Sequence, residues 1–405
     1  MRKIKFTLLF VLLQIATILG INAEIIKGDC GYLGDNVTYT FDTETGVLDF
    51  FGEGKMKDFS YPDYGPWYKN RDKIKIINIS NKITNIGNYA FYGCSGLTSI
   101  NIPNSVTSIE MYAFKDCSGL TSINIPNSVT KIGYGAFRGC SGLTSINIPN
   151  SVTTINKAAF QDCSGLTSIN IPNSVTSIGM YVFKDCSGLT SINIPNSVTK
   201  IGYGAFWGCS KLTNIYIPSS VSDIGIHAFD GCTGLTSINI PKSVTTINDA
   251  AFYGCSGLTS INIPNSVTTI NKAAFYGCSG LTSINIPNSV TTINEAAFYG
   301  CTGLKNIYIY GDKIKYATYN TFDYKTYNQA TLYVPNSLLE EYKKTYLWQN
   351  FKNISVNEGT GISSISVDDI NNCQIYSVDG SKRQTLGRGA NIIKSADGKV
   401  IKVMK

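Results

Sequence analysis

The chain has 405 residues, of which 43% are hydrophobic and 15% charged, with 38 Gly, 25 Tyr, 12 Cys and one His. The apolar fraction is large enough for a core and excludes a disordered chain, while the narrow choice of residue types indicates internal repetition. The net charge of +7 is scattered without a basic stripe, which excludes a nucleic-acid-binding protein.

The first 23 residues have the pattern of a cleaved secretory signal. Arg2, Lys3 and Lys5 precede an apolar run over residues 6–19, and Ala23 supplies a small residue at the exit. A membrane anchor is disfavoured because the run is short for a bilayer span and no second apolar stretch follows. We therefore expect an exported chain that has no transmembrane segment once mature and carries a net charge of about +4.

A 23-residue repeat fills residues 72–301. Ten cysteines recur at this interval from Cys94 to Cys301, and prolines recur at the same interval from Pro103 to Pro287. Several of the ten units are near copies of SGLTSINIPNSVT. A fixed period of this length predicts a solenoid of stacked rungs, one rung per unit.

Residues 95–117 illustrate one rung. Leu97, Ile100 and Ile102 give the L-x-x-L-x-L pattern of a leucine-rich repeat, and their alternation with polar residues predicts a strand with one buried face. Pro103 ends this strand because it has no amide hydrogen. A second short extended segment is expected at 106–109. The chain then turns inward through the residues at 113, 114 and 117.

The energetics predict that a single rung cannot fold alone. About seven inward apolar side chains contribute on the order of 10–20 kcal/mol. Ordering 23 residues costs more than that, at roughly 1.5 kcal/mol each. We therefore expect the array to fold only as an array, with caps covering its two end rungs.

The repeated cysteines are predicted to be free thiols that pack as small apolar groups. Equivalent residues on adjacent rungs lie about 4.8 Å apart and point in parallel directions, whereas a disulfide requires converging Cβ atoms. One ligand per rung also cannot close a tetrahedral zinc site, so no metal is expected. The pairing of Cys30 and Cys373, outside the series, stays open.

The string AFYGCSGLTSINIPNSVTSI at residues 90–109 closely resembles the leucine-rich repeats of BspA-like bacterial surface proteins. The likeness extends to an N-terminal β cap at 24–71, with a hairpin over 37–51 and the Pro66-Trp67-Tyr68 segment. It also extends to residues 302–356, an eleventh strand followed by a closing cap. The amphipathic stretch at 337–348 is expected to form the covering helix.

Residues 357–405 are predicted to form a separate, β-rich module. Strand-like runs occur at 374–378, 387–394 and 399–403, with a turn at Asp379-Gly380. Their order resembles the C-terminal sorting domains of the type IX secretion system of Bacteroidota. The resemblance implies passage through the outer-membrane secretion machinery to the cell surface. The alternative is a small β module without an address function.

No constellation for catalysis occurs in the sequence. A Ser/His/acid order, a metal-ligand spacing and a phosphate loop are all missing, so we expect neither an enzyme nor a cofactor. His227 has no partner motif and is expected to be exposed. The carboxylates of Glu110, Asp230, Asp249 and Glu295 are expected to be isolated surface charges on different rungs.

One candidate binding surface is the outward face of the strands. Its asparagine column comprises Asn78, Asn101, Asn124, Asn147, Asn170, Asn193, Asn239, Asn262 and Asn285. Tyr216 and Tyr308 interrupt it. These side chains either solvate the sheet or form a flat polar recognition face for repetitive partners. The candidate residues on this face are Tyr216, Asn239, Asn262 and Asn285.

A second candidate surface is the residue that follows the repeat phenylalanine, which is predicted to be exposed. It reads Tyr92, Lys115, Arg138, Gln161, Lys184, Trp207, Asp230, Tyr253, Tyr276 and Tyr299 along the array. Tyr and Trp are frequent anchors at interfaces, so Trp207, Tyr253, Tyr276 and Tyr299 form a candidate binding stripe. The alternative is that these rings only pack on neighbouring rungs.

The family resemblance implies adhesion at the bacterial cell surface, to host matrix proteins, other cells or glycans. A structural stalk or surface-layer component without a specific ligand is the alternative, because near-identical rungs offer few distinct sites. Ice or crystal binding is disfavoured, since the strand reads T-S-I-N-I in place of paired threonines. The sequence identifies neither the ligand nor the oligomeric state.

Overall fold

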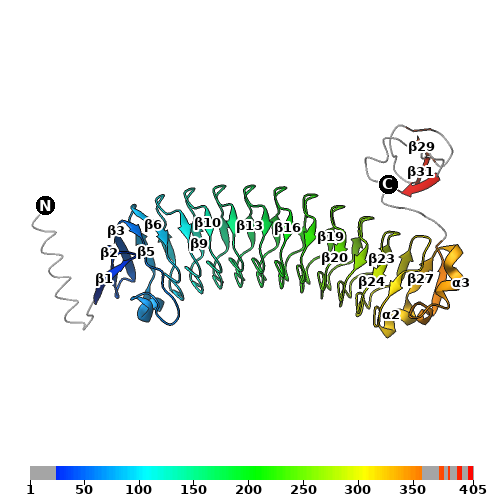
Figure 1. Ribbon diagram of the computed structural model, residues 1–405, viewed down its shortest axis with the longest axis horizontal. Coiled ribbons are helices and arrows are strands. Elements are labelled where there is room, and N and C mark those ends of the chain that lie inside the picture. Colours follow the sequence, from blue (N-terminus) through cyan, green and yellow to red (C-terminus); the bar gives the residue numbers. More distant parts are fainter. Residues whose placement is uncertain (1–23, 358–373, 378–381, 384–389, 395–399, 405) are drawn as a thin grey trace, which may run out of the picture.

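The computed structural model describes residues 24–357 together with four strands at 374–377, 382–383, 390–394 and 400–404. The predicted signal segment at 1–23, Cys373 and the predicted Asp379-Gly380 turn lie outside the described residues. From residue 24 to 357 the chain coils into a long, gently curved stack of rungs (Figure 1). The predicted leucine-rich-repeat solenoid is confirmed.

Parallel strands of two to four residues form the first side of the coil, the strand side. They pair in register, so that Ser145, Ile146 and Asn147 lie opposite Ser168, Ile169 and Asn170. Identical neighbours arise because the period is constant. The strands are β5 (Ile76–Ile79), β7 (Ser99–Asn101), β9 (Ser122–Asn124), β11 (Ser145–Asn147), β13 (Ser168–Asn170), β15 (Ser191–Asn193), β17 (Asn214–Ile215), β19 (Ser237–Asn239), β21 (Ser260–Asn262), β23 (Ser283–Ile286) and β25 (Asn306–Ile309).

The second side carries the shorter strands expected after the proline. They also pair in parallel from rung to rung. In order they are β6 (Ile83–Ile86), β8 (Ser108–Ile109), β10 (Lys131–Ile132), β12 (Thr154–Ile155), β14 (Ser177–Ile178), β16 (Lys200–Ile201), β18 (Asp223–Ile224), β20 (Thr246–Ile247), β22 (Thr269–Ile270), β24 (Thr292–Ile293) and β26 (Tyr316–Ala317).

The third side, the turn side, has no strands but its backbone still pairs between rungs. The amide of Phe91 donates to the carbonyl of Ala113, and that of Gly93 donates to Lys115, both at 2.8 Å. All three sides of a rung therefore hydrogen-bond to the next rung. These bonds pair backbone groups that would otherwise be buried without partners, which is a condition for a stable coil.

The core consists of columns of identical side chains. From Phe114 to Phe322 the phenylalanine rings stack with centroids 5.3–5.8 Å apart. Beside them runs the cysteine column, whose buried thiols are unpaired, as predicted. Each Sγ from Cys117 onward donates to the phenylalanine carbonyl of the preceding rung at 3.1–3.2 Å. Cys30 is also a buried, unpaired thiol, and burial raises its pKa to about 12.

The N-terminal cap is a small sheet placed against the first rung. Strands β1 (Ile25–Gly31), β2 (Gly34–Asp42) and β3 (Val47–Gly52) are antiparallel, and β3 then pairs in parallel with β5. The predicted hairpin is thus confirmed. The cap also contains β4 (Gly54–Lys55) and the 3₁₀ helix η1 (Tyr68–Lys73). Trp67 is buried beneath it, and its Nε1 donates to the carbonyl of Ala90 at 2.8 Å.

The C-terminal cap differs from the long covering helix that the sequence predicts at 337–348. That stretch forms the 3₁₀ helix η2 (Asn336–Leu338) and the short α3 (Leu339–Tyr342). A left-handed backbone at Leu347 then redirects the chain and brings the Trp348 ring against Phe351 and Tyr342. The rings of Tyr342 and Trp348, from either side of this turn, therefore close the core together. One straight helix would not bring them into this contact.

The remaining elements of this cap pair with the last rungs. Strands β27 (Thr331–Val334) and β28 (Asn353–Val356) extend the strand side beyond β25. The sequence analysis missed helix α2 (Tyr324–Gln329), whose start is capped by the Asp323 carboxylate accepting from the amide of Thr326 at 2.7 Å. The 3₁₀ helix η3 (Trp348–Asn350) follows α3.

The described C-terminal strands form one antiparallel sheet in the order β30-β29-β31-β32. They are β29 (Gln374–Ser377), β30 (Lys382–Arg383), β31 (Ala390–Lys394) and β32 (Val400–Met404), which confirms strands within all three predicted runs. In the part of the chain that the structure describes, no helix is both long and apolar enough to cross a bilayer.

Candidate binding surfaces

The backbone of the turn side determines which side chains face out. Ala250 and Gly254 both have positive φ, at 49° and 65°, and they flank the buried Phe252 and the outward Tyr253. Equivalent pairs of left-handed residues recur in the other rungs. This tight turn directs the phenylalanine into the core and the next residue outward.

Three of the predicted stripe residues form a tyrosine column, defined here as Tyr253, Tyr276 and Tyr299. Their rings stack with centroid separations of 4.7 Å and 5.4 Å and interplanar angles of 1° and 19°. Tyr253 and Tyr299 remain 37% exposed. Because neighbouring rings cover each other's faces, the column presents ring edges and hydroxyl groups. Burial, with Tyr276 and Asp230 nearby, raises the pKa of the Tyr253 hydroxyl.

Trp207 belongs to a different cluster. Its ring stacks on His227 at 5.0 Å and 11°, and Lys184 Nζ lies 4.5 Å from the ring centroid. His227 Nδ1 lies 2.7 Å from Asp230 Oδ2. Asp230 occupies the rung between Trp207 and the tyrosine column, so the four predicted stripe residues do not form one continuous surface.

This cluster corrects two expectations. Asp230 was expected at the surface, but it is only 8% exposed, and desolvation raises the pKa of its carboxyl group. His227 was expected to be exposed and without a partner, but it is half-buried between Trp207 and Asp230. Trp207 belongs to the preceding rung, and Asp230 approaches His227 because the backbone at His227 is left-handed. The spacing of residues along the sequence does not reveal either contact.

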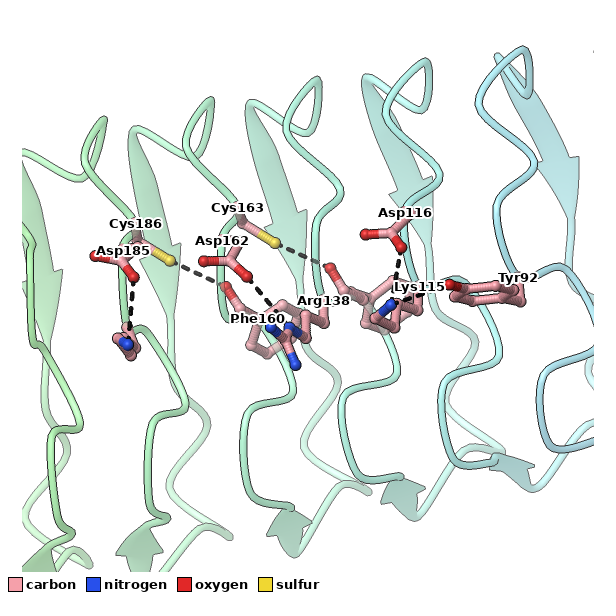
Figure 2. Close-up of polar contacts among 11 residues, drawn as sticks. Tyr92, Lys115, Asp116, Arg138, Phe160, Asp162, Cys163, Asp185 and Cys186 are labelled. Atoms are coloured by element: carbon pink, nitrogen blue, oxygen red, sulfur yellow. Dashed lines mark hydrogen bonds and ion pairs between the residues drawn. The ribbon is translucent and has the colours of Figure 1, made fainter. Parts of the chain in front are cut away.

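The N-terminal half of the turn side carries ion pairs (Figure 2). Lys115 Nζ lies 2.9 Å from Asp116 Oδ2 and 3.3 Å from the Tyr92 hydroxyl. Arg138 Nε lies 3.2 Å from Asp162 Oδ2. The basic residues of this column are therefore neutralised by aspartates at a position where the C-terminal rungs have glycine. These pairs are half-exposed and contribute little to stability.

Two of the carboxylates predicted to be isolated are paired as well. Glu110 Oε2 lies 3.0 Å from Lys131 Nζ, and Glu295 Oε2 lies 2.9 Å from Lys272 Nζ. Both pairs join residues of adjacent rungs, so the repeat places opposite charges side by side. The isolated-charge expectation is wrong for these two residues because it considered each rung alone.

On the strand side the asparagine column is exposed, as predicted, because it alternates with buried isoleucines. Among the described residues, no hydrogen bond joins neighbouring side chains of this column. Asn78 donates to Asp49 Oδ1 of the N-terminal cap at 2.8 Å, and the carboxamides from Asn101 onward face solvent. Tyr216 stands in the column with 62% of its surface exposed.

A hollow of about 530 Å³ lies beside Tyr216. It brings together three of the four predicted residues on this face, Tyr216, Asn239 and Asn262. Asn285, the fourth, does not line it. The other lining residues are Ile217, Ser219, Ile240, Pro241, Lys242, Pro264, Asn265 and Ser266. We call this site the Tyr216 hollow.

Lys242 in this hollow was not among the predicted site residues, although the sequence singles it out. Every other repeat from Asn104 to Asn288 has Asn or Ser after the proline, and only one has a charged residue there. Nearby, Lys211 stands where the other repeats from Gly96 to Gly303 have glycine. The strand ladder is interrupted between β15 and β17, leaving a single bridge from Asn193 to Tyr216. The ladder has two other interruptions on this side.

Metal and cofactor sites are not apparent on either surface. Across the described residues, no group of three or more His, Cys, Asp or Glu side chains is placed to hold a metal ion. The chemistry that these surfaces offer is hydrogen bonding through carboxamides and hydroxyls, with aromatic contact and basic side chains.

Comparison with known proteins gives one family and several solved structures. The family model for the BspA type leucine rich repeat region matches residues 66–189, 154–282 and 268–390. A leucine-rich repeat protein from Bacteroides ovatus is 28% identical, over 78% of this chain and 96% of that one, with a TM-score of 0.49.

Two further structures are similar. A leucine-rich repeat protein from Eubacterium ventriosum is 24% identical, over 68% of this chain and 95% of that one, with a TM-score of 0.41. A leucine rich cell surface protein from Faecalibacterium prausnitzii is 27% identical, over 70% and 95%, with a TM-score of 0.37. No curated protein matches the chain.

Proposed function

The chain belongs to the BspA-type leucine-rich-repeat family, and from this premise we propose that it is a secreted protein that adheres, at the bacterial cell surface, to host matrix proteins, neighbouring cells or glycans. Family membership and the signal-like N-terminus support the location. Leucine-rich-repeat solenoids offer long, regular surfaces for binding and are non-enzymatic scaffolds in this role.

The observation that carries the proposal is the exposure of aromatic side chains at positions that polar residues fill in other rungs. Tyr216 replaces asparagine, and the tyrosine column replaces Lys, Arg or Gln. The rung folds through its inward residues, so these outward rings are not needed for the core. Exposed aromatic residues are the usual anchors of interfaces.

The second candidate function is a structural stalk, which the near-identity of the rungs favours. Most rungs present the same Ser and Asn residues on the strand side. A spacer needs length and rigidity and no distinct site. Under this hypothesis the aromatic side chains contribute nothing to any interaction.

A binding assay separates the two functions. The purified protein is titrated against immobilised matrix proteins and a glycan panel, followed by two variants. In one, Tyr216 becomes Asn; in the other, Tyr253, Tyr276 and Tyr299 become Gln, the residue at 161 in the same column. Because both variants use residues that the array already accepts, they are expected to fold.

Adhesion predicts saturable binding that weakens at least about tenfold in one of the variants, since aromatic anchors dominate interface energies. Substitution of Gln for Lys115 and Arg138 at the charged end serves as the control and should leave binding unchanged. Binding by none of the proteins would support the stalk. Equal saturable binding by all of them would show adhesion that does not depend on the aromatic residues, and would contradict their role as anchors.

We further propose that residues 357–405 direct export through the type IX secretion machinery. The order of the strand-forming runs and their antiparallel sheet support this assignment. Deletion of residues 374–405 in the producing bacterium should leave the protein in the periplasm, as measured by surface labelling and fractionation. Undiminished surface display would show instead a β module without an address function.

A further inference from the structure

We propose that the Tyr216 hollow binds an acidic glycan, a chain of sugars that carries carboxylate groups. This inference rests on the proposed binding function and names the ligand class for one of its surfaces. The hollow combines an exposed aromatic ring, carboxamides and one ammonium group, and each of these groups matches a part of such a ligand.

The walls of the hollow suit a polyhydroxylated partner. Asn239, Asn262, Asn265 and Ser219 are among the residues that line it. A carboxamide both donates and accepts hydrogen bonds, which matches a sugar hydroxyl that does the same. The exposed Tyr216 ring supplies apolar surface for the C–H faces of the sugar, and the largely buried Pro241 and Pro264 lie at the floor of the hollow.

Charge selects an acidic ligand. Lys242 is exposed and takes part in none of the ion pairs of the described chain, whereas Lys115, Lys131, Lys184, Lys200 and Lys272 each pair with a carboxylate. The residues that line the hollow include this one ammonium group and no carboxylate. A ligand carboxylate placed there would gain a charge-assisted hydrogen bond.

The backbone argues against an extended peptide as the ligand. Peptides that add to a sheet need unpaired amides and carbonyls along a strand edge. Here β19 and β21 pair with each other, and β19 also pairs with β17, so their backbone groups already form the rung ladder. Recognition must come from side chains, and these side chains are hydroxyl-binding groups.

An internal comparison isolates what is special about this hollow. A hollow of about 440 Å³ at the other end of the strand side is lined by Asn101, Asn124, Asn147, Asn104 and Asn127, with prolines and isoleucines. It has the same architecture but neither the tyrosine nor the lysine. We therefore expect acidic glycans to select the Tyr216 hollow over the uniform one.

The test uses the protein from residue 24 to 405 and calorimetric titration with two matched pairs of probes. These are sialyllactose with lactose, and a galacturonate oligosaccharide with its carboxyl-reduced form. Two variants return the hollow to the repeat consensus, Lys242→Asn and Tyr216→Asn. A third, Asn127→Lys, places an ammonium group in the uniform hollow as a control for charge alone.

We expect at least one acidic probe to bind and its neutral partner to bind about tenfold more weakly or not at all. Lys242→Asn should remove that preference, whereas Tyr216→Asn should weaken binding of acidic and neutral probes alike. Asn127→Lys should leave the affinity and stoichiometry unchanged.

Three results would overturn the inference: no binding of either acidic probe, unchanged binding by Lys242→Asn, or a second equivalent site in Asn127→Lys. In each case adhesion to matrix proteins, measured separately, could persist. Failure of this inference is thus distinguishable from failure of the proposed function.

Discussion

At the scale of single residues, the cysteine column shows how one chain can hold many thiols without disulfides. Each thiol of the column from Cys117 to Cys301 lies in the core and donates to a phenylalanine carbonyl of the preceding rung. Burial raises the pKa of Cys117 and of Cys140 well above the usual range. The reactive thiolate is therefore suppressed while the array is folded.

This leads to a prediction about thiol chemistry. In a Cys373→Ser background, the cysteine column should resist iodoacetamide under native conditions and react within minutes after denaturation. The label at each cysteine can be located by peptide mass spectrometry. Modification of any column cysteine at the denatured-chain rate would contradict its role as a buried packing group.

Asp230 gives a prediction for pH dependence. Desolvation raises the pKa of this carboxyl group, so the folded protein holds its proton more tightly than the unfolded chain does. The resulting stability is fully present below the ordinary carboxyl pKa and is lost as pH rises through the raised value. Asp230→Asn should therefore raise the Tm relative to the parent more at pH 7 than at pH 3.

Thermal unfolding followed by circular dichroism across this pH range measures the effect. The variant keeps an oxygen acceptor for the His227 ring, which limits the change to the ionisable group. Asp35→Asn, at an exposed position, is the control and should not show a pH-dependent gain. A gap between Asp230→Asn and the parent that does not grow with pH would refute the argument.

The sequence predicts single residues well where the strand period decides their direction. Alternation alone places Asn239 outward and Ile240 inward, and both are found there. It cannot reveal the stacking of Trp207 on His227, because this contact depends on the offset between two rungs. The position of Lys242 in the hollow is likewise not predictable from one rung, because residues of neighbouring rungs form the hollow together.

At the scale of elements, one point of close approach between rungs is the glycine two residues after the repeat cysteine, in the series from Gly96 to Gly303. A Cβ added to Gly165 would overlap the carbonyl oxygen of Ser141, which is backbone and cannot move aside cheaply. Lys211 nevertheless occupies this position in its own rung. The structure around it must already accommodate a Cβ, where only the Asn193–Tyr216 bridge joins β15 and β17.

A pair of substitutions tests this difference. Gly165→Ala should lower the free energy of unfolding by about 1–3 kcal/mol, because the added Cβ forces backbone apart. Lys211→Ala should change it by no more than about 0.5 kcal/mol, since its Cβ is already present. Urea denaturation monitored by tyrosine fluorescence gives both values. Equal losses in the two variants would mean that the glycine position is not a contact limit.

Elements inside the array were predictable, whereas those of the closing cap were less so. The repeat gives the same strand ten times, and each copy supports the others. The closing cap occurs only once. Its amphipathic pattern at 337–348 fits one continuous helix as well as it fits the two short helices and the turn that the structure shows. The left-handed turn at Leu347 is required because Trp348 must be buried against the last rung. No residue near Leu347 signals this turn in the sequence.

At the scale of the whole molecule, the solenoid is a one-dimensional structure in which each rung contacts its neighbours. The backbone ladders on all three sides connect residues about one period apart. Stability is then a sum of rung and interface contributions, and a rung can be removed without disturbing distant ones. The Tyr216 hollow and the tyrosine column both lie in the C-terminal half, far along the chain from the first rungs.

We therefore predict that deletion of residues 118–140, one full unit, preserves a single cooperative unfolding transition. The free energy of unfolding should fall by about 1–3 kcal/mol, the share of one rung at typical stability per residue. Deletion of residues 118–129, half a unit, should abolish cooperative folding, because the truncated rung cannot pair on all three sides. Both are measured by chemical denaturation, with ligand binding as a second readout. The full-unit deletion should bind as the parent does, since both aromatic surfaces are kept. Loss of cooperativity in that variant would show that the array is not a sum of equivalent rungs.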